Sequence, residues 1–220
     1  MYPLMRMALV VVLFSTIFNK GIDKYPAYYF VGFLMFEFFA TATQTSLTTL
    51  KDNRNLLIKS KLPRELFVLS RVLTAFVNFL LGCIPFALVL ACYRANVTVY
   101  YLMIPVVLIL LLIFTTGVSY LVSIWFVFQR DARNIYSNFM FILRFFVAMF
   151  YSIDWMSDGV RWVIERNPLY VFIYVMRQCV VYGQRPEAVY IGRMFGWTIA
   201  MFLVGVLVFR KCENEVVERL

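Results

Sequence analysis

The chain has 220 residues, of which 63% are hydrophobic and 15% are charged, and its net charge is +9. Soluble domains are about half apolar and about a quarter charged, so this composition excludes an ordinary soluble domain and indicates one membrane domain spanning 1–220. The cations flank long apolar blocks instead of gathering on one face, so we expect no nucleic-acid partner. There is no histidine, and the four cysteines lack metal-ligand spacing, so we expect neither a metal nor a cofactor.

The first apolar run covers residues 4–18. As a helix it would be about 22 Å long, short of the roughly 30 Å hydrocarbon core, so it predicts a first span with an irregular beginning. Further apolar blocks predict five more spans, at residues 28–47, 66–92, 99–128, 135–153 and 190–209. The predicted fold class is an all-α membrane protein with six transmembrane helices.

A long insert, 154–189, separates the last two predicted spans. Its core, "NPLYVFIYVMRQCVVYGQRP" (167–186), has about the length of a span but opens with Asn-Pro and contains Arg177 and Gln178. A seventh span is one interpretation. The proline and the polar residues favour short re-entrant or interfacial helices that pack against the other spans.

Lysine and arginine are divided unevenly between the loops. With six spans, one side holds 51–65, 129–133 and the tail from Arg210, with five, two and three cations. The other side has two cations in 19–25 and one in the next loop, although the insert adds four arginines. Because short basic loops stay in the cytoplasm, we expect both termini to be cytoplasmic.

The most basic loop, "KDNRNLLIKSKLPRE" (51–65), is also amphipathic. Among its cations lie four large aliphatic residues, Leu56, Leu57, Ile58 and Leu62. Positive charge alone would explain the loop as a segment that stays on the cytoplasmic side and fixes the orientation of the spans. That role does not require aliphatic side chains. The pattern predicts a short segment whose apolar face binds lipid headgroups or a groove in a partner protein.

Three segments resemble motifs of ABC-2-type permeases that export polysaccharides such as O-antigen, capsule and wall teichoic acid. They are "NLLIKSKLPRELFVLSRVLTAFVNFLL" (55–81), "RDARNI" (130–135) and the 167–186 segment, in the family's order. The resemblance implies a homodimer of six-span subunits in the bacterial plasma membrane, driven by a separate cytosolic ATPase subunit that binds the ATP. It also implies a coupling helix in loop 51–65 that sits in a groove of that ATPase, and short helices at the outer mouth.

The motifs place the family's functional residues at particular positions of this chain. The implied ATPase-coupling residues are Asn55, Leu56, Ile58, Lys59, Leu62, Pro63 and Arg64. Arg130 and Asp131 mark the implied cytoplasmic end of span four, and the implied outer gate segment contains Asn167, Pro168, Leu169, Arg177 and Gly183. We expect no catalytic residues, because the sequence has no Walker motif for ATP hydrolysis.

Two features depart from the family pattern. Family members begin with a basic amphipathic helix, whereas this sequence starts at "MYPLMRMALVV", inside the predicted first span, so we expect that helix to be absent here. Span five usually carries a proline near its outer end, but "FFVAMFY" (145–151) has none and follows Arg144. Glu37 in span two lies at a similar predicted depth to Arg144. Because an unpaired intramembrane charge costs at least about 2.5–3.5 kcal/mol, we predict that they pair within a subunit or across the dimer.

The expected activity is export of a polymer or oligosaccharide attached to a polyprenyl diphosphate lipid, with Arg6, Arg71 and Arg133 as candidates for steering the diphosphate. Aromatic residues, 19% of the chain, suit a carbohydrate path, although each ring could equally pack against lipid. Two alternatives stay open: an ABC-2 permease for drugs or small lipids, and a membrane glycosyltransferase-type enzyme. Against the enzyme stand the missing histidine and the scattered acidic residues.

Overall fold

The computed structural model describes residues 24–59, 63–92, 98–129 and 131–219. The elements in these ranges are all helical, with no strand among them, which confirms the predicted all-α class for the described residues. The α-helices are α2 (Tyr25–Asp52), α3 (Arg54–Lys59), α4 (Glu65–Cys92), α5 (Met103–Phe128), α6 (Ala132–Phe146), α7 (Asp158–Arg166), α8 (Pro168–Arg177) and α9 (Ala188–Arg219). The short elements are the 3-10 helices η1 (Val99–Leu102) and η2 (Ile153–Trp155) and the π-helix η3 (Gln178–Tyr182).

Among the described residues, three helices are long and apolar enough to cross a membrane, namely Glu65–Ala87, Val99–Phe128 and Ala188–Glu213. They correspond to the third, fourth and last predicted spans. α2 contains the second predicted span within its 28 residues, but its polar side chains set it apart from these three. The first predicted span lies outside the described residues, so the count of six spans stays a prediction.

The predicted span 135–153 is shorter in the structure. α6 ends at Phe146, and the chain then turns before η2 begins at Ile153. Ala148 has a φ of +48°, in the left-handed region, where a right-handed helix cannot continue. The predicted end at residue 153 was therefore wrong, because the helix stops before this backbone turn.

The insert forms two short helices, α7 and α8, followed by η3. No single helix of spanning length covers 154–189. This agrees with the prediction of short helices in the insert. Whether they enter the membrane as re-entrant segments stays a prediction.

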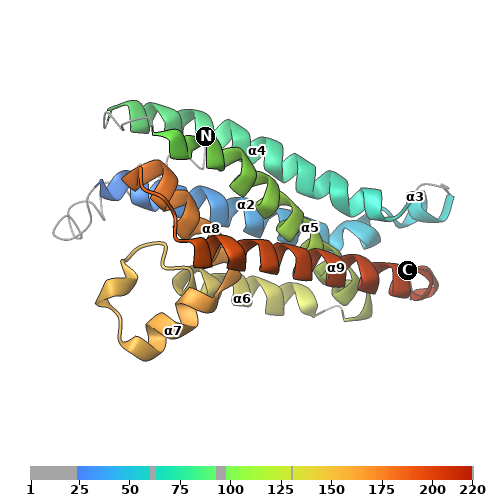
Figure 1. Ribbon diagram of the computed structural model, residues 1–220. Helices are drawn as coiled ribbons and strands as arrows, with labels where there is room; N and C mark the ends of the chain where they lie inside the picture. The colour runs from blue at the N-terminus through green and yellow to red at the C-terminus, as the bar shows by residue number, and fades with distance from the viewer. Residues whose placement is uncertain (1–23, 60–62, 93–97, 130, 220) are drawn as a thin grey trace.

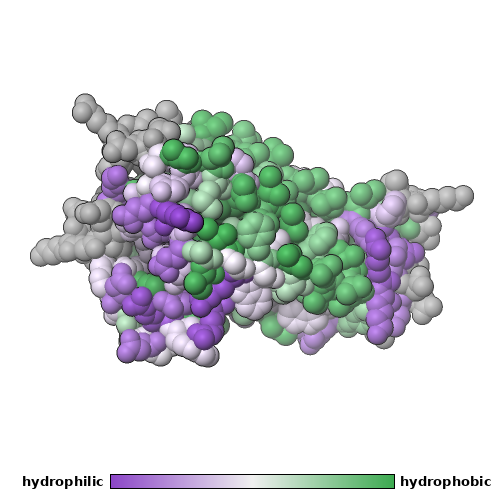
Figure 2. Space-filling view, viewed as in Figure 1, coloured by the Kyte–Doolittle hydropathy of each residue, from purple (hydrophilic) through white to green (hydrophobic). Residues whose placement is uncertain are grey.

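The long helices lie side by side in one bundle, and α2 packs against α4, α5, α6 and α8 (Figure 1). α3, the start of α4 and the end of α9 lie at one end of the bundle, which we call the α3 end, and α7 lies at the other (Figure 1). Figure 2 shows hydrophobic side chains across the middle of the visible face and hydrophilic ones toward both ends. The basic loops that were predicted to share one side of the membrane therefore lie at one end of the bundle.

α5 and α9 approach closely at two glycines. A Cβ added to Gly205 would overlap the backbone of Gly117, and a Cβ added to Gly117 would overlap the backbone of Met201 and Phe202. Small residues that let backbones meet are a main source of helix association in membranes. Gly117 and Gly205 therefore determine how closely α9 packs against α5.

Candidate functional site

The short helix α3 is attached to the α3 end of the bundle through one leucine and presents the preceding leucine outward. Asn53 separates α2 from α3, and its carbonyl accepts hydrogen bonds from the N–H groups of Leu56 (3.0 Å) and Leu57 (2.9 Å). Leu57 is buried in a small apolar cluster with Leu50 and Val68. Leu56 is 58% exposed. Leu56 is therefore accessible to a partner, whereas Leu57 belongs to the protein's own core.

The other predicted coupling residues differ in accessibility. Asn55, Lys59 and Pro63 are exposed. Leu62 and the side chain of Ile58 lie outside the described residues. The structure therefore shows only the part of the predicted apolar face that Leu56 contributes.

Arg64 connects this loop to α9, a role that we did not predict. Its guanidinium donates to the backbone carbonyl of Glu213 at 2.8 Å and forms an ion pair with the Glu213 carboxylate at 3.2 Å. One turn earlier on α9, Arg210 binds the Glu65 carboxylate at 3.1 Å. A force applied to the loop would therefore reach α9 directly through two ion pairs.

The "RDARNI" segment forms the tight connection between α5 and α6. Arg130 lies outside the described residues, and Asp131 is exposed at the N-cap position of α6. The carbonyl of Asp131 accepts hydrogen bonds from the N–H groups of Asn134 (3.1 Å) and Ile135 (3.2 Å). The segment thus starts α6 at the α3 end of the bundle.

The two predicted intramembrane charges form no ion pair with one another in this subunit. The ion pairs among the described residues include none between Glu37 and Arg144. Instead, the Arg144 guanidinium lies 5.3 Å from the ring centroid of Phe36, a cation–π contact, and Glu37 is exposed. Pairing across a dimer stays a prediction.

Glu37 belongs to a polar face of α2 that we did not predict. Its members, exposed or half-buried on an otherwise largely buried helix, are Glu37, Thr41, Gln44, Thr45 and Thr48. Spacings of three and four residues place them on one side of α2. The signal was present in the sequence, because polar residues recur at this spacing in "EFFATATQTSLT" (37–48).

Asn167, Pro168 and Leu169 start α8. The Asn167 side-chain oxygen accepts a hydrogen bond from the Leu169 N–H at 3.0 Å, and its amide nitrogen donates to the Phe146 carbonyl at 3.2 Å. Pro168 occupies the first helical position, where its missing N–H costs nothing, and Leu169 is buried. The Asn-Pro-Leu motif therefore caps α8 and ties its start to the end of α6.

Arg177 is the buried anchor of the segment formed by α8 and η3. The side chain is 3% exposed, and its three guanidinium nitrogens donate to the carbonyls of Tyr28 (3.2 Å), Ala148 (3.1 Å) and Met149 (3.2 Å). It also lies 3.4 Å from the ring centroid of Tyr28. No ion pair of the described residues includes Arg177. Arg177 thus joins α8 to the start of α2 and to the turn after α6.

Gly183 ends η3 in a conformation that suits glycine. Its φ is +62°, and a Cβ at this position would lie 2.8 Å from Oγ1 of Thr98. The N–H of Gln184 then closes the turn by donating to the Gln178 carbonyl at 2.9 Å. Asn167 at the start, Arg177 in the middle and Gly183 at the end therefore shape the segment formed by α8 and η3.

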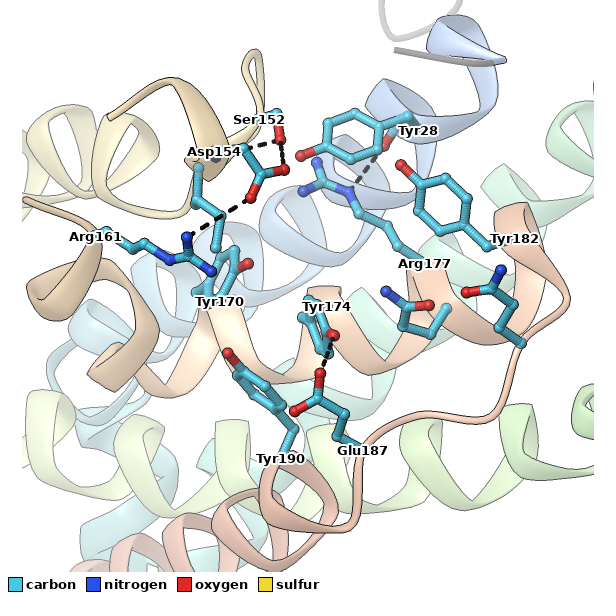
Figure 3. Close-up of a pocket in the computed structure, with 13 residues that line it drawn as sticks. Tyr28, Ser152, Asp154, Arg161, Tyr170, Tyr174, Arg177, Tyr182, Glu187 and Tyr190 are labelled. Atoms are coloured by element: carbon cyan, nitrogen blue, oxygen red, sulfur yellow. Dashed lines mark hydrogen bonds and ion pairs between the residues drawn. The ribbon is translucent and has the colours of Figure 1, made fainter. Parts of the chain in front are cut away.

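A cavity of about 440 Å³ lies beside Arg177, at the end of the bundle opposite α3. Its wall contains five tyrosines, Tyr28, Tyr170, Tyr174, Tyr182 and Tyr190. Figure 3 shows these side chains, together with those of Asp154, Arg161 and Glu187, around a common space. Four of these tyrosines lie within residues 170–190, a cluster that the sequence analysis did not single out, whereas Tyr28 is brought to them only by the fold.

Polar contacts order the rim of this cavity. The Tyr174 hydroxyl lies 3.3 Å from Oε1 of Glu187 and donates to it. Burial, together with the Glu187 carboxylate, raises the pKa of Tyr174 to about 12, so the hydroxyl keeps its proton at neutral pH. Arg161 pairs with Glu165 at 2.9 Å and lies 3.9 Å from Asp154. In the described ranges, no three His, Cys, Asp or Glu side chains gather in a way that could hold a metal ion.

A sequence profile described as "ABC-2 family transporter protein" matches residues 7–210. The chain belongs to the ABC-2 transporter family. The resemblance inferred from the three motifs is thereby confirmed. Membership identifies this ABC-2 protein as a transport subunit, which favours transport over the glycosyltransferase alternative.

Two relatives of this ABC-2 permease carry the name "O-antigen export system permease protein RfbA". The one from Myxococcus xanthus is 26% identical over 220 residues, which cover 98% of this chain and 84% of the relative. The one from Klebsiella pneumoniae is 25% identical over 217 residues, which cover 98% of this chain and 83% of the relative. The permease is thus a homologue of O-antigen export proteins along nearly its full length.

Proposed function

We propose that this chain is the permease subunit of an exporter that moves a polyprenyl-diphosphate-linked polysaccharide, of the O-antigen, capsule or teichoic acid class, across the bacterial plasma membrane. The observation that carries the proposal is the match of 98% of the chain to permeases named for O-antigen export. Both termini face the cytoplasm in this proposal, as the division of lysine and arginine between the loops predicts.

A separate ATPase subunit supplies the energy and binds at α3. Support comes from Leu56, which is 58% exposed beside exposed Lys59 on a helix that projects from the α3 end of the bundle. An exposed apolar side chain at this position fits an apolar groove in a partner protein. The ion pairs from Arg64 and Glu65 to α9 provide a route by which movement at α3 reaches a long helix.

Two copies of the chain form the exporter, and the polar face of α2 borders the path between them. Exposed Glu37 and Gln44 would be costly against lipid, so this face requires a polar neighbour or water. A second copy that covers the face would enclose a hydrophilic path suited to sugar. In this arrangement Glu37 of one copy forms an ion pair with Arg144 of the other.

The proposal is tested at α3 by co-purification of the host's ABC ATPase subunit with the permease and by glycan export in cells. Leu56→Asp places a carboxylate where an apolar groove is expected, and burying an unpaired charge is strongly unfavourable. We expect ATPase binding to weaken at least tenfold, a change of about 1.4 kcal/mol, and export to fail. The permease should still insert, because its apolar helices are unchanged.

Two further variants serve as controls. The Lys59→Gln and Lys61→Gln double variant keeps Leu56 and should retain ATPase binding. Leu57→Asp should instead destabilise the permease itself, because Leu57 is 6% exposed within the bundle. Normal ATPase binding and normal export by the Leu56→Asp protein would contradict the proposal that α3 is the coupling helix.

A further inference from the structure

The tyrosine cavity at the end opposite α3 is a preformed site with a buried floor and an open rim. Tyr28, Tyr170 and Arg177 lie in the floor, each at most 6% exposed, whereas Asp154, Arg161 and Glu187 of the rim are exposed. The floor is held rigidly, because Arg177 is bonded to three backbone carbonyls. A volume of about 440 Å³ lies within the range of small-molecule binding sites.

The cavity offers aromatic rings and hydrogen-bonding groups together. Tyr174 and Tyr190 lie with their ring centroids 4.2 Å apart, and Tyr170 adjoins Tyr174 at 6.0 Å. Gln178 and Gln184 complete the wall with amide donors and acceptors. Aromatic rings pack against the C–H faces of sugar rings, and amide, hydroxyl and carboxylate groups bind sugar hydroxyls.

The charges of the cavity favour a neutral ligand. Arg161 and Arg177 are balanced by Asp154 and Glu187, so the charged residues of the wall sum to zero. A wall without net positive charge gives a diphosphate no net attraction. A lipid tail fits the polar wall poorly, and it would find a better match in the separate apolar cavity of about 240 Å³ near Leu34, Phe79 and Cys83.

We propose that this cavity binds an uncharged saccharide unit of the exported glycan on the outer side of the membrane. The inference deepens the proposed function and rests on it for the source of the ligand. Because Arg177, Gln178 and Tyr182 follow one another along α8 and η3, a sugar bound there contacts the same segment that joins α2 to the turn after α6. The site would hold the glycan chain as it leaves the permease on the outer side of the membrane.

The test is a binding measurement on the full permease–ATPase complex in lipid nanodiscs, free of maltoside detergents because their headgroups are themselves saccharides. The probes are neutral trisaccharides of glucose, mannose, galactose and rhamnose, with trigalacturonic acid and inorganic pyrophosphate as anionic probes. Saturation-transfer NMR and calorimetry report binding. We expect at least one neutral trisaccharide to bind with a Kd below about 1 mM, and the anions to bind more weakly.

Variants locate the binding to this cavity. Tyr182→Ala removes a ring that is 40% exposed at the rim and should weaken saccharide binding about five- to tenfold. Tyr174→Phe removes the hydroxyl that donates to Glu187 and should weaken it less. Trp162→Ala is the matched control, since Trp162 is an aromatic residue of neighbouring α7, 58% exposed and outside the cavity, and it should leave the affinity unchanged.

The outcomes separate this inference from the proposed function. Failure of every neutral trisaccharide to bind, preference for an anionic probe, or equal affinity of the wild-type and Tyr182→Ala proteins would overturn the saccharide site while glycan export stands. Saccharide binding by a permease whose deletion leaves surface glycan unchanged would instead support the site and overturn the exporter.

Discussion

Replacing Arg177 with methionine should destabilise the permease by an amount that follows from its contacts. The change removes the donor for three carbonyls, those of Tyr28, Ala148 and Met149. An unsatisfied buried carbonyl costs about 1–3 kcal/mol, but the variant also escapes the cost of burying a charge, and water from the adjoining cavity can reach some of the freed oxygens. We therefore expect a net loss of about 2–4 kcal/mol.

Gly32 provides an independent way to disturb the same anchor. A Cβ at Gly32 would lie 2.7 Å from Nη2 of Arg177, whereas its next neighbour, Cγ of Met149, is 3.5 Å away. Gly32→Ala should therefore displace the guanidinium in the wild-type background and cost much less once Arg177 is methionine. Gly192→Ala is the matched control, because nothing lies within 4 Å of a Cβ at that position.

The assay is thermal unfolding in nanodiscs at one fixed scan rate, since unfolding of membrane proteins is often irreversible. For a chain of this size, 2–4 kcal/mol corresponds to a fall in Tm of about 5–15 °C for Arg177→Met. Gly32→Ala should lower the Tm by more than Gly192→Ala does. The Tm loss of the Gly32→Ala and Arg177→Met double variant should be smaller than the sum of the two single losses. Strict additivity of Gly32→Ala and Arg177→Met, or an unchanged Tm for Arg177→Met, would refute the role of Arg177 as an anchor.

Three further predictions concern other parts of the bundle. Gly205→Leu should separate α9 from α5, because the new Cβ would overlap the backbone of Gly117. The stability should fall by about 1–3 kcal/mol or more, which a Tm measurement would show. A Tm within about one degree of wild type would contradict this packing. Arg64→Ala should change the Tm little, because half-exposed ion pairs contribute at most about 1 kcal/mol to stability. The same variant should nevertheless reduce ATP-driven export. Unchanged export would show that the ion pair between Arg64 and Glu213 is not part of the coupling route. Saccharide affinity should be nearly the same at about pH 10 as at about pH 7, because the Tyr174 pKa is raised from the ordinary value near 10 to about 12. Affinity should fall only as the pH rises towards 12, as calorimetry across this range would show.

Much of the helical architecture could be predicted from apolar run length and flanking charge. The runs at 66–92 and 99–128 match α4 and η1 with α5 within a residue or so, because a continuous apolar run bounded by polar residues fixes both ends of a spanning helix. The end of α6 could not be predicted in this way. It depends on the left-handed backbone at Ala148, which leaves no trace in hydropathy.

The candidate sites were predicted in part. The motif around Asn167 identified a segment that the structure shows to be built by an N-cap and a buried arginine. The sequence could not show that Leu56 is exposed and Leu57 is buried, because two neighbouring leucines differ only in which of them contacts the core of the bundle. The pairs from Arg64 and Glu65 to α9 join residues about 150 positions apart, a relation that only the folded bundle creates.

The most direct test of the central claim is glycan display in cells that lack this gene. Cells of the native host should lose the polymer from their surface and accumulate it, still linked to its lipid carrier, in the cytoplasmic leaflet. Restoring the chain together with its ATPase should return the polymer to the surface, and the Leu56→Asp chain should not. Surface glycan that persists undiminished in the deletion strain would contradict the account of this permease as a polysaccharide exporter.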